Sequence, residues 1–415
     1  MKFYVETFGC KVNAYESNFV IKSLEDNGFI LVNDINNANI IIVNTCTVTN
    51  TADSKCKKFI RRVKREYSNA ILCVMGCSSQ NNFSLYKDMK IDILLGNNEK
   101  SKIAEIINEY LSTNKSYEYY SNNRDLEFES MEINDFNHTR AFLKIQDGCD
   151  NFCSYCIIPF VRGKCRSKSF SDVILEAKNL VKNNHKEIVL TGIHTGSYND
   201  NGKDLVDVIN ELSKIEGLLR IRLSSVEVTE LNDKFMDMLK NNPKFCNHLH
   251  IPLQAGSDNV LKKMNRKYDM KYFFDKIDLI RSIRNDISIT TDIIVGFPEE
   301  TSEDFQNTLD NSRKLKFSKI HVFPYSKRNG TVASKMKDVE DNVKSLRVHK
   351  LLKLSSELEC EYENKFNGTM QDVLIEEVND KCSIGHTSNY LKVVVPEVLE
   401  KNTLVNVLYD KDNLK

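Results

Sequence analysis

Cys149, Cys153 and Cys156 stand in one short segment with the spacing C-x3-C-x2-C. Disulfides are rare in a reducing compartment, and a structural zinc site normally takes four ligands in paired spacings. Three thiolates on one tight loop instead suit a 4Fe–4S cluster in which one iron has no protein ligand. Such an open iron can bind a substrate or a cofactor directly. Three incidental cysteines or an incomplete zinc site are the alternatives.

A second group of three cysteines is spread along the N-terminal part of the chain. Cys10, Cys46 and Cys77 follow the sequences TFG, VNT and VMG, each of which ends a short apolar run. If these runs are neighbouring parallel strands, the three thiols meet at the carboxyl edge of one sheet. The other cysteines lack ligand spacing and are expected to be small hydrophobic residues: Cys56, Cys73, Cys165, Cys246, Cys360 and Cys382. A fourth thiol ligand from Cys165 would close the open iron.

The elements that must position these cysteines follow an α/β pattern. Predicted strands at residues 3–8, 39–44, 70–75 and 91–95 alternate with predicted helices at 15–27, 52–67 and 102–111. We assign residues 1–113 to an α/β domain with a mostly parallel sheet. Residues 114–137 are interpreted as a linker, because residues 117–136 hold six acids against the single base Arg124 and show no apolar periodicity.

A longer alternation begins after the linker. Strands are predicted at 142–146, 187–191, 219–224, 248–252, 288–295 and 319–324, followed by a long charged helix at 340–365. These units indicate a partial (β/α)6 barrel over residues 138–367, whose chemistry belongs at the carboxyl ends of its strands. Runs at 372–377, 389–395 and 403–409 predict a small all-β barrel over residues 368–415.

Composition limits the partners. The chain has 415 residues, 41% of them hydrophobic and 28% charged, and no apolar window long enough for a membrane span. Glu6 and Lys11 stand where a signal peptide has its apolar segment, which favours a cytoplasmic protein. Because the formal net charge is zero, contact with nucleic acid must be local. Residues 55–65 hold seven basic side chains and no acid, so that helix could face phosphates or only solvent.

The motifs resemble one enzyme family over nearly the whole chain. The segment at residues 147–168, with Tyr155 before the last cysteine of its loop, is similar to the cluster loop of the radical S-adenosylmethionine (SAM) superfamily. FGCKVNAYES at 8–17, VNTCTVTNTADSK at 43–55 and VMGCSSQ at 74–80 resemble the cysteine motifs of the methylthiotransferases. HIPLQAGSDNVLKKMNRKY at 250–268 and TTDIIVGFPEET at 290–301 resemble barrel motifs of that family, and the C-terminal part resembles its RNA-binding TRAM domain.

The sequences of these motifs resemble those of the MtaB type of methylthiotransferase, which acts on N6-threonylcarbamoyladenosine at position 37 of tRNA. The resemblance lies in GCKVN at 9–13 followed by Tyr15 and Glu16, in TCTVT at 45–49 and in TGIHTG at 191–196. Methylthiotransferases that act on isopentenyladenosine in tRNA, or on an aspartate of a ribosomal protein, usually have different residues at these motif positions. They remain alternatives, as does a non-catalytic iron–sulfur RNA-binding protein.

The resemblance implies two 4Fe–4S clusters, one on Cys149, Cys153 and Cys156 and one on Cys10, Cys46 and Cys77. The first would reduce SAM to a radical that takes hydrogen from C2 of the adenine, and the second would carry the sulfur. An electron donor and a sulfur donor are then needed. The residues expected to line SAM are Tyr155, Gly192, Ser224, Glu227, Gln254 and Val295. Each polar group or glycine among them could equally be a turn or core residue.

Two further expectations concern the substrate. A threonylcarbamoyl group carries a carboxylate, so its site needs a cationic or multi-donor group. The cations on or near barrel strands and loops are Arg220, Arg222, Arg266, Lys327 and Arg328. His194 and His250 are expected in the core or at helix caps rather than around a substrate.

Overall fold

The computed structural model describes residues 1–121 and 126–414, and its N-terminal part is built on a parallel sheet. The strand order is β2-β1-β3-β4-β5-β6. The strands are β1 Lys2–Thr7, β2 Ile30–Leu31, β3 Ile40–Thr45, β4 Ile71–Gly76, β5 Ile93–Leu95 and β6 Tyr117–Tyr119. All six residues of β3 are buried, which is typical of a central parallel strand that is covered on both faces.

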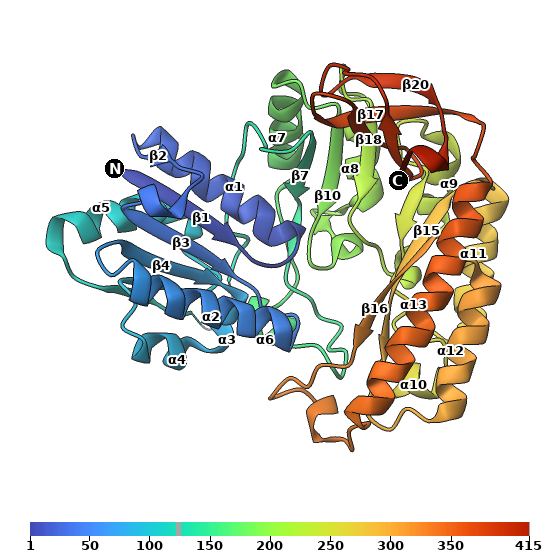
Figure 1. Cartoon of the computed structure of the whole chain (residues 1–415), viewed down its shortest axis with the longest axis horizontal. Helices are drawn as coiled ribbons and strands as arrows, with labels where there is room; N and C mark the ends of the chain where they lie inside the picture. Colours follow the sequence, from blue (N-terminus) through green and yellow to red (C-terminus); the bar gives the residue numbers. More distant parts are fainter. Residues whose placement is uncertain (122–125, 415) are drawn as a thin grey trace.

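Helices cover both faces of this sheet (Figure 1). They are α1 Lys11–Asp26, α2 Asn50–Glu66, α3 Cys77–Asn81, α4 Phe83–Asp88 and α5 Ile103–Thr113. Leu24 of α1 and Ile107 of α5 belong to one core, and Ile60 of α2 and Tyr86 of α4 belong to the other. The short α3 begins at the carboxyl edge of the sheet, next to β4.

The middle of the chain forms an open barrel of six parallel strands. The strands are β7 Arg140–Lys144, β10 Glu187–Thr191, β13 Arg220–Leu223, β14 His248–His250, β15 Ser288–Val295 and β16 Lys319–Pro324. They pair in the orders β13-β10-β7 and β14-β15-β16. An isolated bridge pairs Ile221 of β13 with Phe245, shortly before β14 begins.

Helices follow the barrel strands and form its outer layer, and α13 crosses the front of β16 at the end of the barrel (Figure 1). They are α7 Phe170–Lys182, α8 Leu205–Leu212, α9 Asp233–Asn241, α11 Met270–Ile283, α12 Ser302–Leu315 and α13 Asp341–Asn364, with the short α6 Ile158–Arg162 and α10 Asp258–Lys263. The short pairs are β8 Gln146–Asp147 with β9 Arg166–Ser167, and β11 Asn199–Asp200 with β12 Lys203–Asp204. The first of these pairs closes the base of the cysteine loop.

The C-terminal part is an antiparallel sheet in the order β19-β18-β17-β20. Its strands are β17 Met370–Val378, β18 Ser383–Thr387, β19 Lys392–Val395 and β20 Leu404–Leu408. Val373, Ile375 and Val393 pack with Tyr362 at the end of α13. Figure 1 places this sheet against the barrel, at the end where β10 and β15 begin.

The predicted parallel sheet and partial barrel are confirmed, with three differences in detail. Helix α1 begins at Lys11, directly after Cys10, rather than at Tyr15. The tail has four strands rather than three, because the polar strand β18 gives no apolar run. In the segment predicted as a linker, β6 pairs with β5, and Ile133 and Phe136 are buried in the barrel core. Residues 122–125, with Arg124, lie outside the described residues. No helix in the described part of the chain could cross a membrane.

Candidate active site

Two glycines at strand ends bring the N-terminal cysteines together. Cys10, Cys46 and Cys77 follow β1, β3 and β4, which are neighbours in the sheet. Gly9 has a φ of +119°, and a Cβ there would lie 2.9 Å from Cβ of Cys46. Gly76 has a φ of +109°, and a Cβ there would lie 2.6 Å from a carbonyl oxygen of β3. Both positions therefore require glycine if the cysteine-bearing loops are to approach this closely.

The thiols of this group lie near enough to affect one another's ionisation. Burial, together with the thiols of Cys77 and Cys10, raises the pKa of Cys46 to about 12. Cys56 lies beside the group, and its Sγ accepts the backbone N–H of Cys46 at 3.4 Å. Cys56 is buried, as predicted for a small hydrophobic residue, but it also holds the backbone of Cys46 in place.

The cysteines of the C-x3-C-x2-C segment lie on the loop between β8 and β9, beyond the carboxyl end of β7. Burial, together with the thiols of Cys153 and Cys149, raises the pKa of Cys156 to about 12. The guanidinium of Arg266 donates to Sγ of Cys153 at 3.4 Å. The loop thus gathers three thiols at the barrel end where reactions take place in folds of this kind.

His194 connects Cys149 to Cys165. Burial opposes protonation of His194, but its hydrogen bonds to Cys149, Cys165 and Glu230 raise its pKa to about 12. Sγ of Cys165 also lies 3.3 Å from the hydroxyl of Ser197. His194 occupies the N-cap position of the 3-10 turn Thr195–Ser197, as expected for a capping residue, but its side chain does not cap the turn. Its partly buried ring instead contacts Asn151 of the cysteine loop at 3.5 Å.

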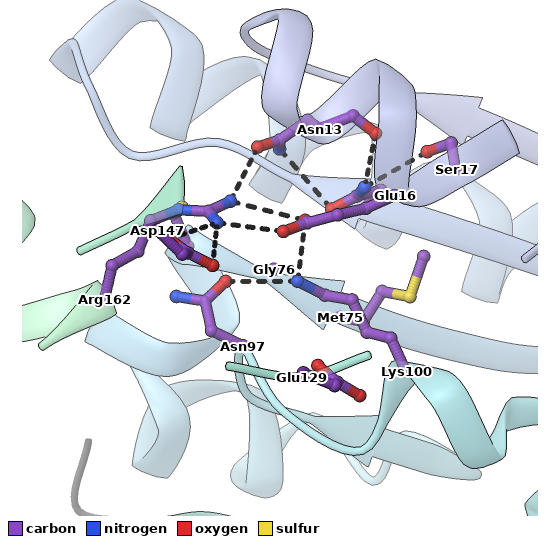
Figure 2. A network of polar contacts seen from close by, with 12 residues as sticks. Asn13, Glu16, Ser17, Met75, Gly76, Asn97, Lys100, Glu129, Asp147 and Arg162 are labelled. Carbon is purple, nitrogen blue, oxygen red and sulfur yellow. Dashed lines mark hydrogen bonds and ion pairs between the residues drawn. The ribbon is translucent and has the colours of Figure 1, made fainter. Parts of the chain in front are cut away.

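A buried polar network centred on Arg162 connects the start of α1 with the residues on both sides of the cysteine loop (Figure 2). Nε of Arg162 donates to Sγ of Cys77 at 3.2 Å. The same guanidinium donates to Glu16 at 2.9 Å, to Asp147 at 3.1 Å and to Asn13 at 3.1 Å. Since Asp147 precedes the cysteine loop and Arg162 follows it, these contacts fix the loop against α1 of the N-terminal part.

The carboxylate of Glu16 is surrounded by cations in this network. Glu16 also accepts from Lys100 at 2.7 Å and from Lys144 at 2.9 Å, and Lys144 donates to Asp147 at 2.7 Å. Burial alone would raise the pKa of the Glu16 carboxyl, but Arg162, Lys100 and Lys144 hold it well below its usual range. The guanidinium of Arg162, which contacts Sγ of Cys77, places positive charge where an anionic cluster would bind.

Side chains from all six barrel strands line one cavity of about 710 Å³. One residue from each strand illustrates the lining: Arg140, Thr191, Arg222, His250, Asp292 and His321. The start of α1, including Cys10 and Lys11, closes one side, and Tyr390 from the turn between β18 and β19 closes another. The cavity therefore depends on all three parts of the chain. Its size is that of a small-molecule site, roughly 300–1,000 Å³.

The six residues expected to line SAM are not all in this cavity. Gly192 and Ser224 line it. Glu227 forms an ion pair with Arg266, whose guanidinium also contacts Cys153. Glu227 thus lies next to the cysteine loop rather than in the cavity.

The other three expected SAM residues do not line the cavity either. The ring of Tyr155 packs edge-on against Phe297, with centroids 6.5 Å apart. Gln254 has a φ of +65° and pairs through its backbone with Ile293 of β15. The side chain of Val295 is fully buried in the barrel core.

Of the cations proposed for a carboxylate site, only Arg222 lines the cavity within the described residues. Its Nε donates to Glu187 at 2.7 Å, so its charge is already balanced. Arg220 donates to backbone carbonyls of Asp372 and His386, which attaches the C-terminal sheet to β13. Arg220, Arg266, Lys327 and Arg328 do not line this cavity. His250 lines the cavity as well, and its ring contacts Thr290 at 2.9 Å and Asp292 at 3.3 Å.

Sequence reasoning missed several residues of this region. Cys10, Asn13 and Glu16 are spaced three residues apart, which places them on one face at the start of a helix, so this signal was available. The Sγ of Cys10 lies 3.7 Å from Oδ1 of Asn13. No sequence pattern indicated Tyr390 as a residue of the site, because it reaches the cavity only through the packing of the C-terminal sheet against the barrel.

The donor chemistry of both cysteine groups fits an iron–sulfur cluster. Burial raises the pKa of Cys46 in one group and of Cys156 in the other to about 12, and ligation by iron would deprotonate such thiols. Arg162 at Cys77 and Arg266 at Cys153 would offset the negative charge of the bound thiolates.

The fold and the cysteine loop define the class of protein. The family model described as "Radical SAM superfamily" matches residues 143–311, and "Uncharacterized protein family UPF0004" matches residues 2–96. The solved structure of the radical S-adenosylmethionine methyltransferase TsrM from Kitasatospora setae has a TM-score of 0.58 at 15% identity. It covers 80% of this chain and 77% of its own, which is a likeness of fold. The chain is a radical SAM protein.

Relatives define the family more narrowly. Threonylcarbamoyladenosine tRNA methylthiotransferase MtaB of Bacillus subtilis (strain 168) is 40% identical over 94% of this chain and 89% of its own length. MtaB of Thermotoga maritima is 39% identical over 90% and 86%. The tRNA-2-methylthio-N(6)-dimethylallyladenosine synthase of Thermodesulfovibrio yellowstonii is 33% identical over 97% and 95%. The chain belongs to the methylthiotransferase family of radical SAM enzymes, and the predicted cofactors, SAM and 4Fe–4S clusters, follow from this membership.

Proposed function

We propose that this protein attaches a methylthio group to C2 of N6-threonylcarbamoyladenosine at position 37 of tRNA. The observation that carries the proposal is a cavity that is bordered by Cys10 and lined by all six barrel strands. The two MtaB relatives and the similarity of the motif sequences to the MtaB type support the threonylcarbamoyl substrate. Neither observation favours an isopentenylated tRNA, a ribosomal protein or a purely structural role.

Two groups of residues would hold the clusters. Cys149, Cys153 and Cys156 would hold the one that SAM binds, and Cys10, Cys46 and Cys77 would hold the other. When bound, these groups supply the one-electron chemistry and the sulfur that side chains lack, since no side-chain base can usefully deprotonate an aromatic carbon.

The protein's own residues fix the geometry for that chemistry. The network of Arg162, Glu16 and Asp147 holds the cysteine loop against α1, so the two cysteine groups keep one relative position. The cavity is lined by residues from all three parts of the chain, which would position a bound nucleoside between them. For SAM, Gly192 and Ser224 are the expected residues best placed, because they line this cavity.

The basic helix α2 is the surface that we propose for tRNA phosphates. Lys55, Lys58 and Arg61 line a groove with the rings of Phe8 and Phe59. No ion pair with a carboxylate engages these three cations among the described residues, so their charges are available to phosphates. A basic groove with aromatic rings suits RNA in a way that the net-neutral chain as a whole does not.

Three further assignments remain proposals. The domains are 1–113, a connecting segment 114–137, the barrel with its trailing helix 138–367, and a TRAM-like RNA-binding sheet 368–415. A reductant protein and a sulfur donor must act with the enzyme, and we place it in the cytoplasm with tRNA.

The test is a reaction of the anaerobically reconstituted protein with two purified tRNAs. One carries N6-threonylcarbamoyladenosine and the other carries isopentenyladenosine. Nucleoside mass spectrometry should show the 2-methylthio product only from the first. Equal turnover of both tRNAs would contradict the proposed substrate, and absence of product from both would contradict the proposed reaction.

A further inference from the structure

One cation in the cavity differs from the rest. The lining includes four cationic side chains: Lys11, Arg140, Arg222 and Lys319. Three of them have carboxylate partners, namely Glu376 for Arg140 at 3.0 Å, Glu187 for Arg222 at 2.7 Å and Glu359 for Lys319 at 2.8 Å. Among the residues that the structure describes, the ammonium of Lys11 has neither an ion pair nor a hydrogen bond.

Lys11 is held firmly in this position. It is the first residue of α1, directly after Cys10, and its side chain is half-buried. Further along the same helix, the hydroxyl of Tyr15 donates to the backbone carbonyl of Met131 at 2.6 Å, and Asn13 accepts from Arg162 at 3.1 Å. The helix cannot easily move to give Lys11 another partner. A half-buried cation without a partner is costly unless an anion is to bind there.

No other polar group that lines the cavity in the described residues offers an unpaired positive charge to an anion. The charges of Arg140 and Arg222 are balanced by their carboxylate partners. Both guanidinium groups also lie over the ring of Tyr390, at 5.2 Å and 4.8 Å from its centroid. Among the described lining residues the only carboxylate is that of Asp292, whose oxygen lies 3.3 Å from Nε2 of His250. An anionic ligand therefore finds one uncompensated positive charge, and it lies beside the cysteine that borders the cavity.

We propose that Lys11 binds the carboxylate of the threonylcarbamoyl group and is the residue that selects this substrate, an inference that rests on the proposed function. The ammonium pairs with the carboxylate through a charge-assisted hydrogen bond. An apolar dimethylallyl group offers Lys11 no such partner and leaves its charge unpaired. Specificity then arises from both the gain with one substrate and the cost with the other.

The experiment is a double-mutant cycle on binding, which needs no turnover. The reconstituted protein is titrated anaerobically with an anticodon stem-loop RNA that carries threonylcarbamoyladenosine, either as the free acid or as its methyl ester. The wild-type protein should bind the acid about tenfold to a hundredfold more tightly than the ester, as expected for a charge-assisted bond. In Lys11→Met the ratio of the two dissociation constants should fall to about one.

The matched control is Lys271→Met, which removes an exposed lysine that pairs with Asp275 on α11. It should keep the wild-type ratio. Iron content and the visible absorption of the clusters are measured on each variant, because Lys11 adjoins Cys10. A wild-type protein that binds acid and ester equally would overturn the inference without any variant. A Lys11→Met variant that keeps the full preference for the acid would also overturn it.

These outcomes are separate from those of the proposed function. Formation of the 2-methylthio nucleoside by the wild-type protein tests the reaction, whereas the ratio of acid to ester binding tests Lys11. If the product forms and the ratio is one, the function stands and the inference fails. If binding discriminates but the only product comes from isopentenylated tRNA, the proposed function fails and the inference fails with it.

Discussion

Replacing Glu16 by Gln should destabilise the protein strongly, although the two side chains have almost the same shape. Glu16 is fully buried and is the carboxylate partner of Lys100, Lys144 and Arg162. Arg162 and Lys144 keep Asp147 as a second partner. Lys100 is itself fully buried and, among the described residues, keeps only the amide oxygen of Asn97, at 3.4 Å, and the electrostatic attraction of the nearby Glu129 carboxyl. The variant therefore leaves one buried ammonium that, within the described part of the chain, has no carboxylate in hydrogen-bond contact.

The size of the expected loss in folding free energy follows from this one buried ammonium. Removing one partner of a buried ion pair costs about 3–5 kcal/mol, because the other charge stays desolvated. Urea unfolding of the cluster-free protein, followed by circular dichroism, should show a loss of this size in Glu16→Gln. The double variant Glu16→Gln/Lys100→Met should recover part of it, since no buried ammonium is left unpaired.

Helix α1 offers a matched control. Asp26 pairs with Lys22 at 2.8 Å near its end, and both side chains are exposed. Asp26→Asn should cost less than about 1 kcal/mol. If Glu16→Gln costs no more than Asp26→Asn, the network does not hold the cysteine loop against α1 and the reasoning is refuted.

The remaining predictions concern the clusters, the RNA and pH. The reconstituted protein should hold about eight irons, and replacing Cys149, Cys153 and Cys156 by Ala should leave about four, whereas Cys165→Ala should change nothing; full iron in the triple variant would exclude that ligand set. Cys46→Ala should abolish methylthiolation while cleavage of SAM to 5′-deoxyadenosine persists, and any methylthio product from this variant would exclude the sulfur role. Lys58→Glu/Arg61→Glu should weaken tRNA binding and reduce its salt dependence, with a slope lower by roughly 0.7–0.9 for each phosphate that the variant no longer neutralises; an unchanged slope would place the RNA elsewhere. Because the pKa of Glu16 is lowered in the folded state, its stabilisation is complete above about pH 4.5 and decreases below it; urea midpoints of the wild-type protein should fall with pH more steeply than those of Glu16→Gln.

Much of the fold could be predicted because its strands alternate with helical patterns along the chain. The expected bounds of β10, β15 and β16 agree with the structure, since each is a short run rich in β-branched and aromatic residues between helical patterns. β6 and β18 were missed, because YEY and SIGHT are short and partly polar and become strands only by pairing with neighbours.

Only those residues of the candidate site whose spacing in the sequence marks them, namely the cysteines, could be predicted. The cysteine groups follow from their positions after strands, which parallel topology brings to one edge. The contact of Arg162 with Glu16 joins positions 146 residues apart, and no local pattern reports it. For the same reason the sequence pointed to Arg220 and Arg266 as cavity cations, whereas the structure, over the residues it describes, leaves Lys11 as the lining cation without a partner.

The most direct test of the central claim is nucleoside analysis in a living host that lacks its own enzyme. The host expresses either this protein or its Cys46→Ala variant, and its tRNA is digested and analysed by mass spectrometry. The account predicts 2-methylthio-N6-threonylcarbamoyladenosine with the unaltered protein and only the unmethylthiolated nucleoside with the variant. The same methylthio nucleoside in both strains, or its absence from both, would contradict it.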